Sequence, residues 1–368
     1  MMSNTQSFLH SSVDISSPIP VAEPEDAGLQ RDVLDQVDQI IQKQYPKMRS
    51  FLLLHAGKLI YERYYNGHGI TSLNDLRSAT KSFTSVLCGI AHSRGELPDL
   101  NSSVIDIFQR YVPERAHPLL QKVSLHHLLT MTSGFAWQTG KKLGEPLIHR
   151  FHRNQKWTSF ALSLPVIEQQ MGLFQYRSTD SHLLSVAISE ATGLDAYAYA
   201  RQHVFEPLGI RHTAWSPSPE GHSMGHIGLY LTSRDMAKFG LCCLNGGLWQ
   251  GTTLIPESWL KQALAPQVEG YPAFGDYGFQ WWTGVQNGTP FALAHGHGGQ
   301  QIYLFPQLDT VAVFTADSKV SRWKNPRFLL ERYILNDLKS KSATSSPNAD
   351  KSPASDSMQE AFDSLASL

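Results

Sequence analysis

The position of the strand-like segments constrains the fold of this chain more than any other feature. Near the N-terminus, apolar runs at residues 51–55 and 59–65 flank the turn Ala56-Gly57-Lys58, a pattern that predicts a β-hairpin. Strand patterns return only after residue 254, at 277–282, 290–295, 301–305 and 311–315, whereas residues from about 100 to 225 read mostly as helices and loops. Strands at both ends with helices between them predict one mixed α/β domain that carries a helical insertion.

Helical and low-complexity segments set the expected domain boundaries. An amphipathic helix is expected over 29–44, where five apolar side chains share one face: Val33, Leu34, Val37, Ile40 and Ile41. A second helix, over 325–338, is expected to close the fold. The domain should therefore span residues 29–338, with the helical insertion at about 100–225. Residues 1–28, rich in Ser and Pro, are expected to be extended, and residues 339–368, which hold few apolar side chains, to be disordered.

Composition and charge exclude several functional classes. The formal net charge is −1 over 368 residues and no long basic run occurs, so neither nucleic acid nor an anionic membrane is an expected partner. No apolar run approaches the length of a membrane span, and residues 1–20 lack the basic and apolar regions of a signal peptide. The three cysteines, Cys88, Cys242 and Cys243, lie in apolar helical patterns that favour buried reduced thiols and a cytoplasmic location.

Ser78 and Lys81 are the first candidates for chemistry. They form a Ser-x-x-Lys pattern at the start of a helical run that Gly95 ends, and a spacing of three places both side chains on one helix face. A serine hydroxyl needs a neighbouring base to act as a nucleophile. A lysine serves as that base only where burial or a nearby positive charge lowers its pKa. Taken alone, the pattern also fits an N-cap serine followed by a solvated lysine.

Two later stretches carry further candidates. Residues 174–184 include Tyr176, which can hold or relay a proton beside a lysine, or can be a packed aromatic with a satisfied hydroxyl. Residues 294–300, Ala-His-Gly-His-Gly-Gly-Gln, form a strand edge with three glycines. Glycine lets a backbone approach a ligand closely, which suits an oxyanion-hole donor, although a tight turn between two strands would have the same composition.

A rival motif lies at residues 221–225. Gly221-His-Ser223-Met-Gly225 fits the Gly-x-Ser-x-Gly nucleophile elbow of α/β-hydrolases, which requires a preceding strand and a following helix. Loop-forming residues precede this motif and a strand pattern follows it, so we interpret the match as accidental. His222 and His226 are four residues apart but lack the glutamate of a zinc-protease helix, and no metal site is predicted there.

Together these stretches resemble the motifs of the serine β-lactamase and penicillin-binding-protein superfamily. Ser78-x-x-Lys81 is followed about a hundred residues later by Tyr176-x-Ser178, and then by a glycine-rich strand late in the chain. Supporting stretches lie at 128–134, 190–193, 207–209, 232–236 and 299–300. The closest likeness is to class C β-lactamases and the related family VIII esterase-like and amide hydrolases. Over roughly residues 29–338, the resemblance implies a β-lactamase/transpeptidase-like fold, an antiparallel sheet flanked by helices with an inserted helical subdomain.

The resemblance also implies roles for individual residues. Ser78 would be the acylated nucleophile, Lys81 its base, and Tyr176 the group that returns a proton to the leaving group. The backbone N–H groups of Ser78 and His297 would form the oxyanion hole, and water would then deacylate the enzyme. A small-molecule ester or amide is the expected substrate, and neither a cofactor nor a metal ion is expected.

Two departures from the family pattern bear on the substrate. Ser178 stands where the family often has Asn, and His295 or His297 stands where true β-lactamases have a lysine that binds a substrate carboxylate. Neither histidine is a permanent cation at neutral pH, and Arg177 is the other basic residue that could replace the lysine. We therefore expect hydrolysis of short-chain esters, with weak or no β-lactamase activity.

The remaining expectations concern the walls of the substrate site. We expect five residues to contact substrate: Ser178, Trp137, Trp282, His295 and Gly298. Phe135, Trp137, Trp281 and Trp282 would suit an apolar acyl or alcohol group, and core packing explains them equally well. Three alternatives stay open, namely hydrolysis of amides or D-amino-acid peptides, β-lactamase activity on the same fold, and a catalytically quiet member used for binding.

Overall fold

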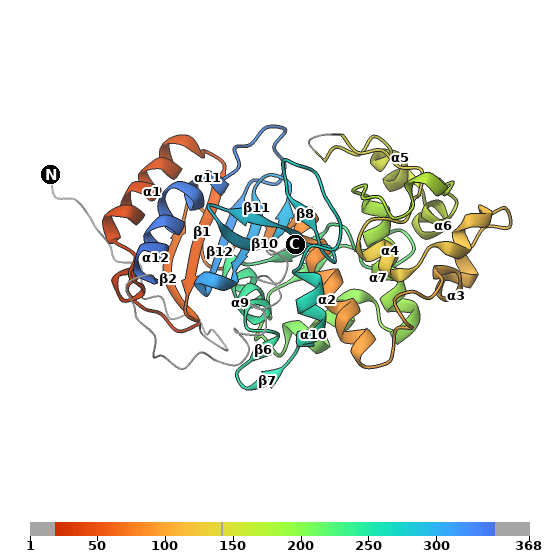
Figure 1. Ribbon diagram of the computed structural model, residues 1–368, viewed down its shortest axis with the longest axis horizontal. Coiled ribbons are helices and arrows are strands. Elements are labelled where there is room, and N and C mark those ends of the chain that lie inside the picture. The colour runs from red at the N-terminus through yellow and green to blue at the C-terminus, as the bar shows by residue number, and fades with distance from the viewer. Residues whose placement is uncertain (1–18, 141–142, 343–368) are drawn as a thin grey trace.

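A seven-stranded antiparallel sheet lies at the centre of the computed structural model, which describes residues 19–140 and 143–342 (Figure 1). The strand order is β2-β1-β12-β11-β10-β9-β8. The strands are β1 (Met48–His55), β2 (Lys58–Tyr64), β8 (Asp276–Tyr277), β9 (Trp282–Gln286), β10 (Thr289–Gly296), β11 (Gln300–Phe305) and β12 (Thr310–Ala316). Every pairing is antiparallel, which confirms the predicted mixed α/β class and sheet type.

The two ends of the chain meet in the middle of this sheet. The predicted hairpin β1–β2 is present, and β1 pairs with β12 from His55 opposite Thr310 to Met48 opposite Ala316. Because the first hairpin and the last strand are neighbours, the chain between them must leave the sheet and return to it. The helices of the middle of the chain are therefore an insertion between strands.

Side chains alternate between two cores, one on each face of the sheet. Phe51 and Leu53 of β1 face the side covered by α1 (Arg31–Gln44), a π-helical turn (Leu330–Ile334) and α12 (Leu335–Ser342). Leu52 and Leu54 face α2 (Thr80–Ser93) and α9 (Ser233–Leu244) on the other side. Burial on both faces explains why these strands read as nearly continuous apolar runs.

The helical part lies beside the sheet, at the right of Figure 1. It contains α3 (Val104–Phe108), α4 (Leu125–Leu129), α5 (Ile148–Arg153), α6 (Trp157–Leu162), α7 (Ser178–Thr192) and α8 (Ala196–Ala200). All of these fall within the predicted insertion at about 100–225. Further along the chain, α10 (Glu257–Ala263) packs against α2. Two small sheets complete the fold. One has the strand order β3 (Asn74–Asp75), β5 (Leu229–Leu231), β4 (Ala214–Trp215), and the other pairs β6 (Leu248–Trp249) with β7 (Thr252–Thr253). No helix in the described ranges is both long and apolar enough to cross a membrane.

Three predicted boundaries differ from the structure. Residues 277–282 are not one strand, because a turn at 278–281 separates β8 from β9. The last helix ends at Ser342, four residues after its predicted end, and the lead-in segment holds a short 3₁₀ helix (Pro24–Ala27) in place of fully extended chain. Residues 1–18 and 343–368 lie outside the described residues, and the predicted disorder of the tail from 343 onward with them.

Gln280 explains the turn that the strand pattern missed. Its backbone adopts a left-handed φ of 62°, and its side-chain amide donates to the carbonyl oxygens of Leu128 and Leu129. Ser181 of α7 donates to the same amide (2.5 Å), and Ser82 of α2 donates to the Gln280 carbonyl (2.9 Å). One buried residue of the β8–β9 turn therefore fixes α2, α4 and α7 relative to one another.

Gly89 offers a test of the packing between α2 and α10. A Cβ atom at this position would lie 2.3 Å from the ring of Trp259, a buried side chain of α10. We expect Gly89→Ala to lower the free energy of unfolding by about 1–3 kcal/mol, because overpacking outweighs the higher helix propensity of alanine. Gly69→Ala is the control, since its Cβ would meet nothing within 4 Å. Equal thermal midpoints for the two variants would contradict this packing.

Candidate active site

Ser78 and Lys81 lie at the junction of the sheet and the helical part. Ser78 is in a 3₁₀ turn (Arg77–Ala79) that leads directly into α2, where Lys81 is one turn further on. The Lys81 Nζ is 3.4 Å from the Ser78 Oγ, so the predicted pair shares one face of the chain. Ser78 is partly exposed, whereas Lys81 is buried with 1% of its surface accessible. The candidate nucleophile is therefore partly accessible, whereas the candidate base beside it is not.

The surroundings of Lys81 favour its neutral form. Its Nζ lies 3.1 Å from the His226 carbonyl oxygen and 3.3 Å from the Ser178 Oγ. Burial lowers the pKa of Lys81 to about 7; the charge of Glu145 raises it in part, and that of Arg77 lowers it further. At neutral pH a large fraction of this amine holds a lone pair that can accept a proton.

Tyr176 is buried next to the same amine. The Lys81 Nζ lies 4.8 Å from the centroid of the Tyr176 ring, which stacks on Trp282 with centroids 6.0 Å apart. Burial raises the pKa of Tyr176 well above its usual value and Glu145 adds to this, while a hydrogen bond with Ser78 opposes it. The phenol is therefore neutral at physiological pH, and a neutral phenol donates a proton.

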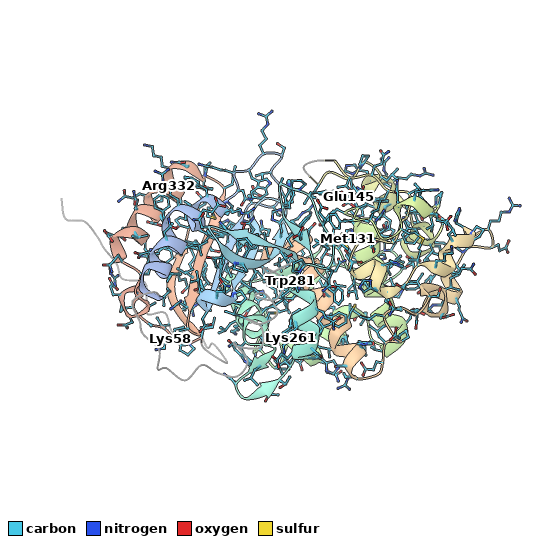
Figure 2. The ribbon with its side chains drawn as sticks, viewed as in Figure 1. Lys58, Met131, Glu145, Lys261, Trp281 and Arg332 are labelled. Carbon is cyan, nitrogen blue, oxygen red and sulfur yellow. The ribbon has the colours of Figure 1, made fainter. Side chains whose placement is uncertain are left out.

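Glu145 is a site residue that the sequence did not reveal. It belongs to the segment before α5 in the helical part (Figure 2). Its Oε1 accepts hydrogen bonds from the Ser178 backbone N–H and from the Trp137 Nε1, both at 2.7 Å, and its Oε2 accepts from the Ser178 Oγ at 2.6 Å. A single glutamate in a loop carries no motif signal, and only the folded chain brings it to Ser178.

The glycine-rich stretch at residues 294–300, called the third stretch below, lies against the Ser78 turn. A Cβ atom on Gly296, at the end of β10, would lie 2.2 Å from the Leu76 carbonyl oxygen, so only glycine permits this approach. His295 is buried, and burial lowers its pKa to about 4, with His297 and Arg327 contributing. Its Nδ1 accepts a hydrogen bond from Gln301. His295 is therefore neutral, as the sequence suggested.

The three residues after Gly296, namely His297, Gly298 and Gly299, form the turn between β10 and β11. His297 has an exposed side chain whose Nε2 donates to the Val320 carbonyl oxygen (2.6 Å). Gly298 is buried with φ of 84°, and a Cβ there would lie 2.6 Å from the Asp317 carbonyl oxygen. The backbone conformation accounts for this glycine, and the expected roles of His297 in the oxyanion hole and of Gly298 in substrate binding stay predictions.

Arg177 is not the substitute cation for a substrate carboxylate, and that interpretation of the sequence was wrong. Its side chain is fully buried and donates to three backbone carbonyl oxygens, those of Met131, Phe135 and Gln175. Burial lowers the pKa of Arg177, and Asp180 opposes this. The guanidinium therefore ties the segment 131–135 to the backbone at Gln175, and its burial keeps it from a substrate carboxylate.

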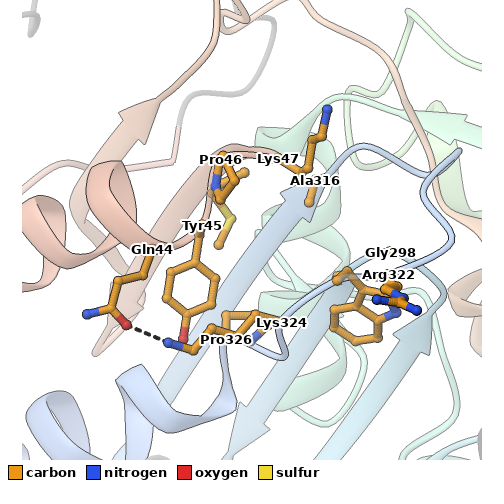
Figure 3. Close-up of a pocket in the computed structure, with 12 residues that line it drawn as sticks. Gln44, Tyr45, Pro46, Lys47, Gly298, Ala316, Arg322, Lys324 and Pro326 are labelled. Atoms are coloured by element: carbon orange, nitrogen blue, oxygen red, sulfur yellow. Dashed lines mark hydrogen bonds between the residues drawn. The ribbon is translucent and has the colours of Figure 1, made fainter.

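A cavity of about 280 Å³ adjoins the third-stretch turn (Figure 3). Its lining includes Gly298, Arg322, Trp323 and Lys324, and the Lys324 Nζ donates to the Gln44 Oε1 at 2.5 Å. Ser78, Lys81 and Tyr176 are not among its lining residues. Arg322 and Lys324 therefore line a cavity that does not include the three candidate catalytic residues.

The four aromatic candidates divide into two pairs. Phe135 and Trp281 are fully buried in the core, and Trp281 stacks on Phe239 with ring centroids 6.1 Å apart. Trp137 and Trp282 are also buried, but they contact Glu145 and Tyr176 respectively. Core packing therefore explains the first pair, whereas the second pair supports residues of the candidate site.

The rival serine has a structural place. Ser223 is buried, its Oγ donates to Asp195 (2.9 Å), and it accepts from the Tyr197 backbone N–H (3.0 Å), which ties its loop to α8. No strand-elbow-helix surrounds it. His222 bonds to Tyr111 and His226 to His152, and among the described residues no cluster of histidine, cysteine and carboxylate side chains could hold a metal ion.

Comparison with known proteins agrees with this geometry. The family model described as Beta-lactamase matches residues 38–329. A 6-aminohexanoate-dimer hydrolase from Paenarthrobacter ureafaciens is 25% identical and covers 75% of this chain and 73% of its own length.

Solved structures share the fold. EstCE1, described as a hydrolase with promiscuous acyltransferase activity, superposes with a TM-score of 0.67 at 14% identity over 83% of this chain and 97% of its own. A D-stereospecific amidohydrolase from a Streptomyces species superposes with a TM-score of 0.62 at 16% identity over 83% and 99%. The family match covers most of the chain, and it places this protein in the beta-lactamase family of serine hydrolases.

Proposed function

We propose that this protein hydrolyses short-chain carboxylic esters through an acyl-enzyme on Ser78. The observation that carries the proposal is the buried Lys81 amine, with its pKa lowered to about 7, within 3.4 Å of a partly exposed serine hydroxyl. Elsewhere a lysine is protonated at neutral pH and cannot activate a serine.

The proposed reaction proceeds in two halves. Ser78 Oγ attacks the carbonyl carbon as its proton passes to the Lys81 Nζ, and backbone N–H groups of Ser78 and His297 hold the resulting oxyanion. The neutral Tyr176 hydroxyl gives its proton to the leaving oxygen, and the proton taken up by Lys81 replaces it. Water then attacks the acyl-Ser78 ester while Lys81 accepts a proton from that water. The acyl–Oγ bond breaks, Lys81 returns the proton to the Ser78 Oγ, and the acid product leaves.

The substrate class follows from charge. The third stretch presents a neutral His295 and glycines in place of a fixed cation, and a charge-assisted hydrogen bond of this kind is worth roughly 1.5–3 kcal/mol. A neutral ester has no carboxylate to bind, so the missing cation does not weaken its binding. An anionic β-lactam does lose this hydrogen bond. Trp137 and Trp282 give the surroundings of Tyr176 and Glu145 an aromatic character that suits an apolar acyl or alcohol group.

Hydrolysis of a linear amide is the second candidate. The curated relative named 6-aminohexanoate-dimer hydrolase favours it, as does the fold shared with the D-stereospecific amidohydrolase. An amine is a poorer leaving group than a phenol, so an amide would depend on proton donation by Tyr176 more strongly than an activated ester does.

Replacement of the serine tests the nucleophile. We expect Ser78→Ala to lower kcat for p-nitrophenyl butyrate by roughly 10³-fold or more, because no acyl-enzyme can form. Ser223→Ala is the matched control. It should keep kcat within a few-fold and lower only the thermal midpoint, since two structural hydrogen bonds are lost. The reverse pattern would transfer the nucleophile to Ser223.

The pH dependence of kcat/KM tests the base. Lys81 must be deprotonated to act, so kcat/KM should fall about tenfold for each pH unit below about 7 and level off above it. Lys81→Arg should be nearly as inactive as Lys81→Ala, because a guanidinium stays protonated. Lys261→Arg, at a partly exposed site on α10, is the control. An active Lys81→Arg variant would show that the lysine supplies only charge.

A substrate comparison tests the proposed class. We expect kcat/KM for p-nitrophenyl butyrate to exceed that for a chromogenic cephalosporin by at least about one to two powers of ten. A short linear amide measured on the same preparation decides the second candidate. A cephalosporin value equal to the ester value would overturn the ester assignment, and would assign carboxylate binding to Arg322 or Lys324 of the adjoining cavity.

A further inference from the structure

We propose that Glu145 is a positioning residue that directs the lone pair of Lys81 at Ser78 by holding the single hydroxyl proton of Ser178. This inference rests on the proposed function, since it concerns how the same Ser78–Lys81 pair is prepared for attack. It follows from counting the hydrogen-bond donors and acceptors around one buried amine.

The Lys81 amine has three oxygen neighbours. They are the His226 carbonyl oxygen at 3.1 Å, the Ser178 Oγ at 3.3 Å and the Ser78 Oγ at 3.4 Å. A neutral amine offers two N–H donors and one lone pair, so one neighbour must face the lone pair. The carbonyl oxygen can only accept, and it therefore takes one N–H. The choice is between the two serine hydroxyls.

Glu145 decides between them. The Ser178 hydroxyl has one proton, and the 2.6 Å hydrogen bond to the Glu145 Oε2 uses it. The Ser178 Oγ can then only accept from Lys81, so it takes the second N–H. The lone pair is left for the Ser78 hydroxyl, which is the arrangement that proton transfer from the nucleophile requires.

The carboxylate is itself held in one orientation. Its Oε1 accepts from the Trp137 Nε1 and from the Ser178 backbone N–H, and both groups can only donate. Its Oε2 accepts from the Ser178 hydroxyl, so both oxygens of the Glu145 side chain must accept. A carboxylate can do this, whereas an amide has only one oxygen. Trp137 is buried and pairs with Glu145 from the helical part, which gives this tryptophan a role besides core packing.

The same count gives a physical reason for the Ser178 departure from the family pattern. An asparagine in place of Ser178 would present an amide oxygen, which only accepts, to Lys81. A serine hydroxyl becomes an equivalent acceptor only when its proton is held elsewhere, and Glu145 holds it. Glu145 also stands one hydroxyl away from Lys81, so it does not form the direct ion pair that would keep the amine protonated.

The test is Glu145→Gln, assayed on p-nitrophenyl butyrate over pH 5 to 9. The amide introduced by this substitution should keep its oxygen toward the two N–H donors and turn its nitrogen to the Ser178 Oγ. The Ser178 proton would then point at the Lys81 lone pair. We expect kcat to fall about 10- to 100-fold with little change in KM.

A second readout distinguishes this role from simple support of the fold. The charge of Glu145 raises the pKa of Lys81, so its removal should move the acid limb of kcat/KM to lower pH. Adding Ser178→Asn to Glu145→Gln should restore much of kcat, because the asparagine oxygen needs no partner to stay an acceptor. Glu168→Gln, an exposed glutamate paired with Lys122, should change neither quantity.

The outcomes separate the two proposals. If the wild-type protein hydrolyses no ester, or Ser78→Ala stays active, the proposed function fails whatever Glu145 does. If Ser78 is essential but Glu145→Gln has the kcat and the acid limb of kcat/KM of the wild-type protein, the positioning role is overturned. It is also overturned if kcat falls, the acid limb of kcat/KM stays at the wild-type pH, and Ser178→Asn restores no activity. Should Glu145→Gln not fold, Glu145→Ala takes its place, because it also releases the Ser178 proton, and an undiminished kcat in that variant rejects the proposal.

Discussion

The proposed chemistry of this protein depends on the burial of one lysine amine. An ammonium ion removed from water loses much of its hydration, and a buried lysine keeps its charge only where a carboxylate pairs with it directly. Around Lys81 the polar neighbours within hydrogen-bond distance are two hydroxyls and a carbonyl oxygen, and the carboxylate of Glu145 bonds to one of those hydroxyls, that of Ser178. The result is an amine whose pKa falls to about 7 next to a partly exposed serine.

The fold supplies three rigid supports for that amine. Ser78 lies in the 3₁₀ turn that leads into α2, and Lys81 lies in the first turn of α2. Gln280 of the β8–β9 turn bonds to α2, α4 and α7 and so fixes the positions of these three helices. The end of β10 approaches the Ser78 turn so closely that Gly296 has no room for a side chain. Residues from the sheet and from the helical part thus meet at one point, although about two hundred residues of sequence separate them.

Much of this was predictable from the sequence, and the exceptions have physical reasons. The strand patterns at both ends, the hairpin and the Ser-x-x-Lys spacing depend on short-range periodicity, and the structure confirms them. The 277–282 segment has the composition of a strand, but tertiary hydrogen bonds to Gln280 convert it to a turn. Arg177 could be considered as a replacement for the family's lysine only because burial cannot be read from one residue. Glu145 gave no signal at all, since its role depends on contact with a hydroxyl thirty-three residues away.

Covalent labelling tests the central claim most directly. A fluorophosphonate reacts only with an activated serine, so the account predicts one labelled site per chain on the peptide that contains Ser78, with labelling that weakens as Lys81 becomes protonated below pH 7. Mass spectrometry of the digested protein locates the label. Absence of labelling at pH 8, or a label on Ser223 instead, would contradict an activated Ser78 and would favour a binding protein or a different nucleophile on the same fold.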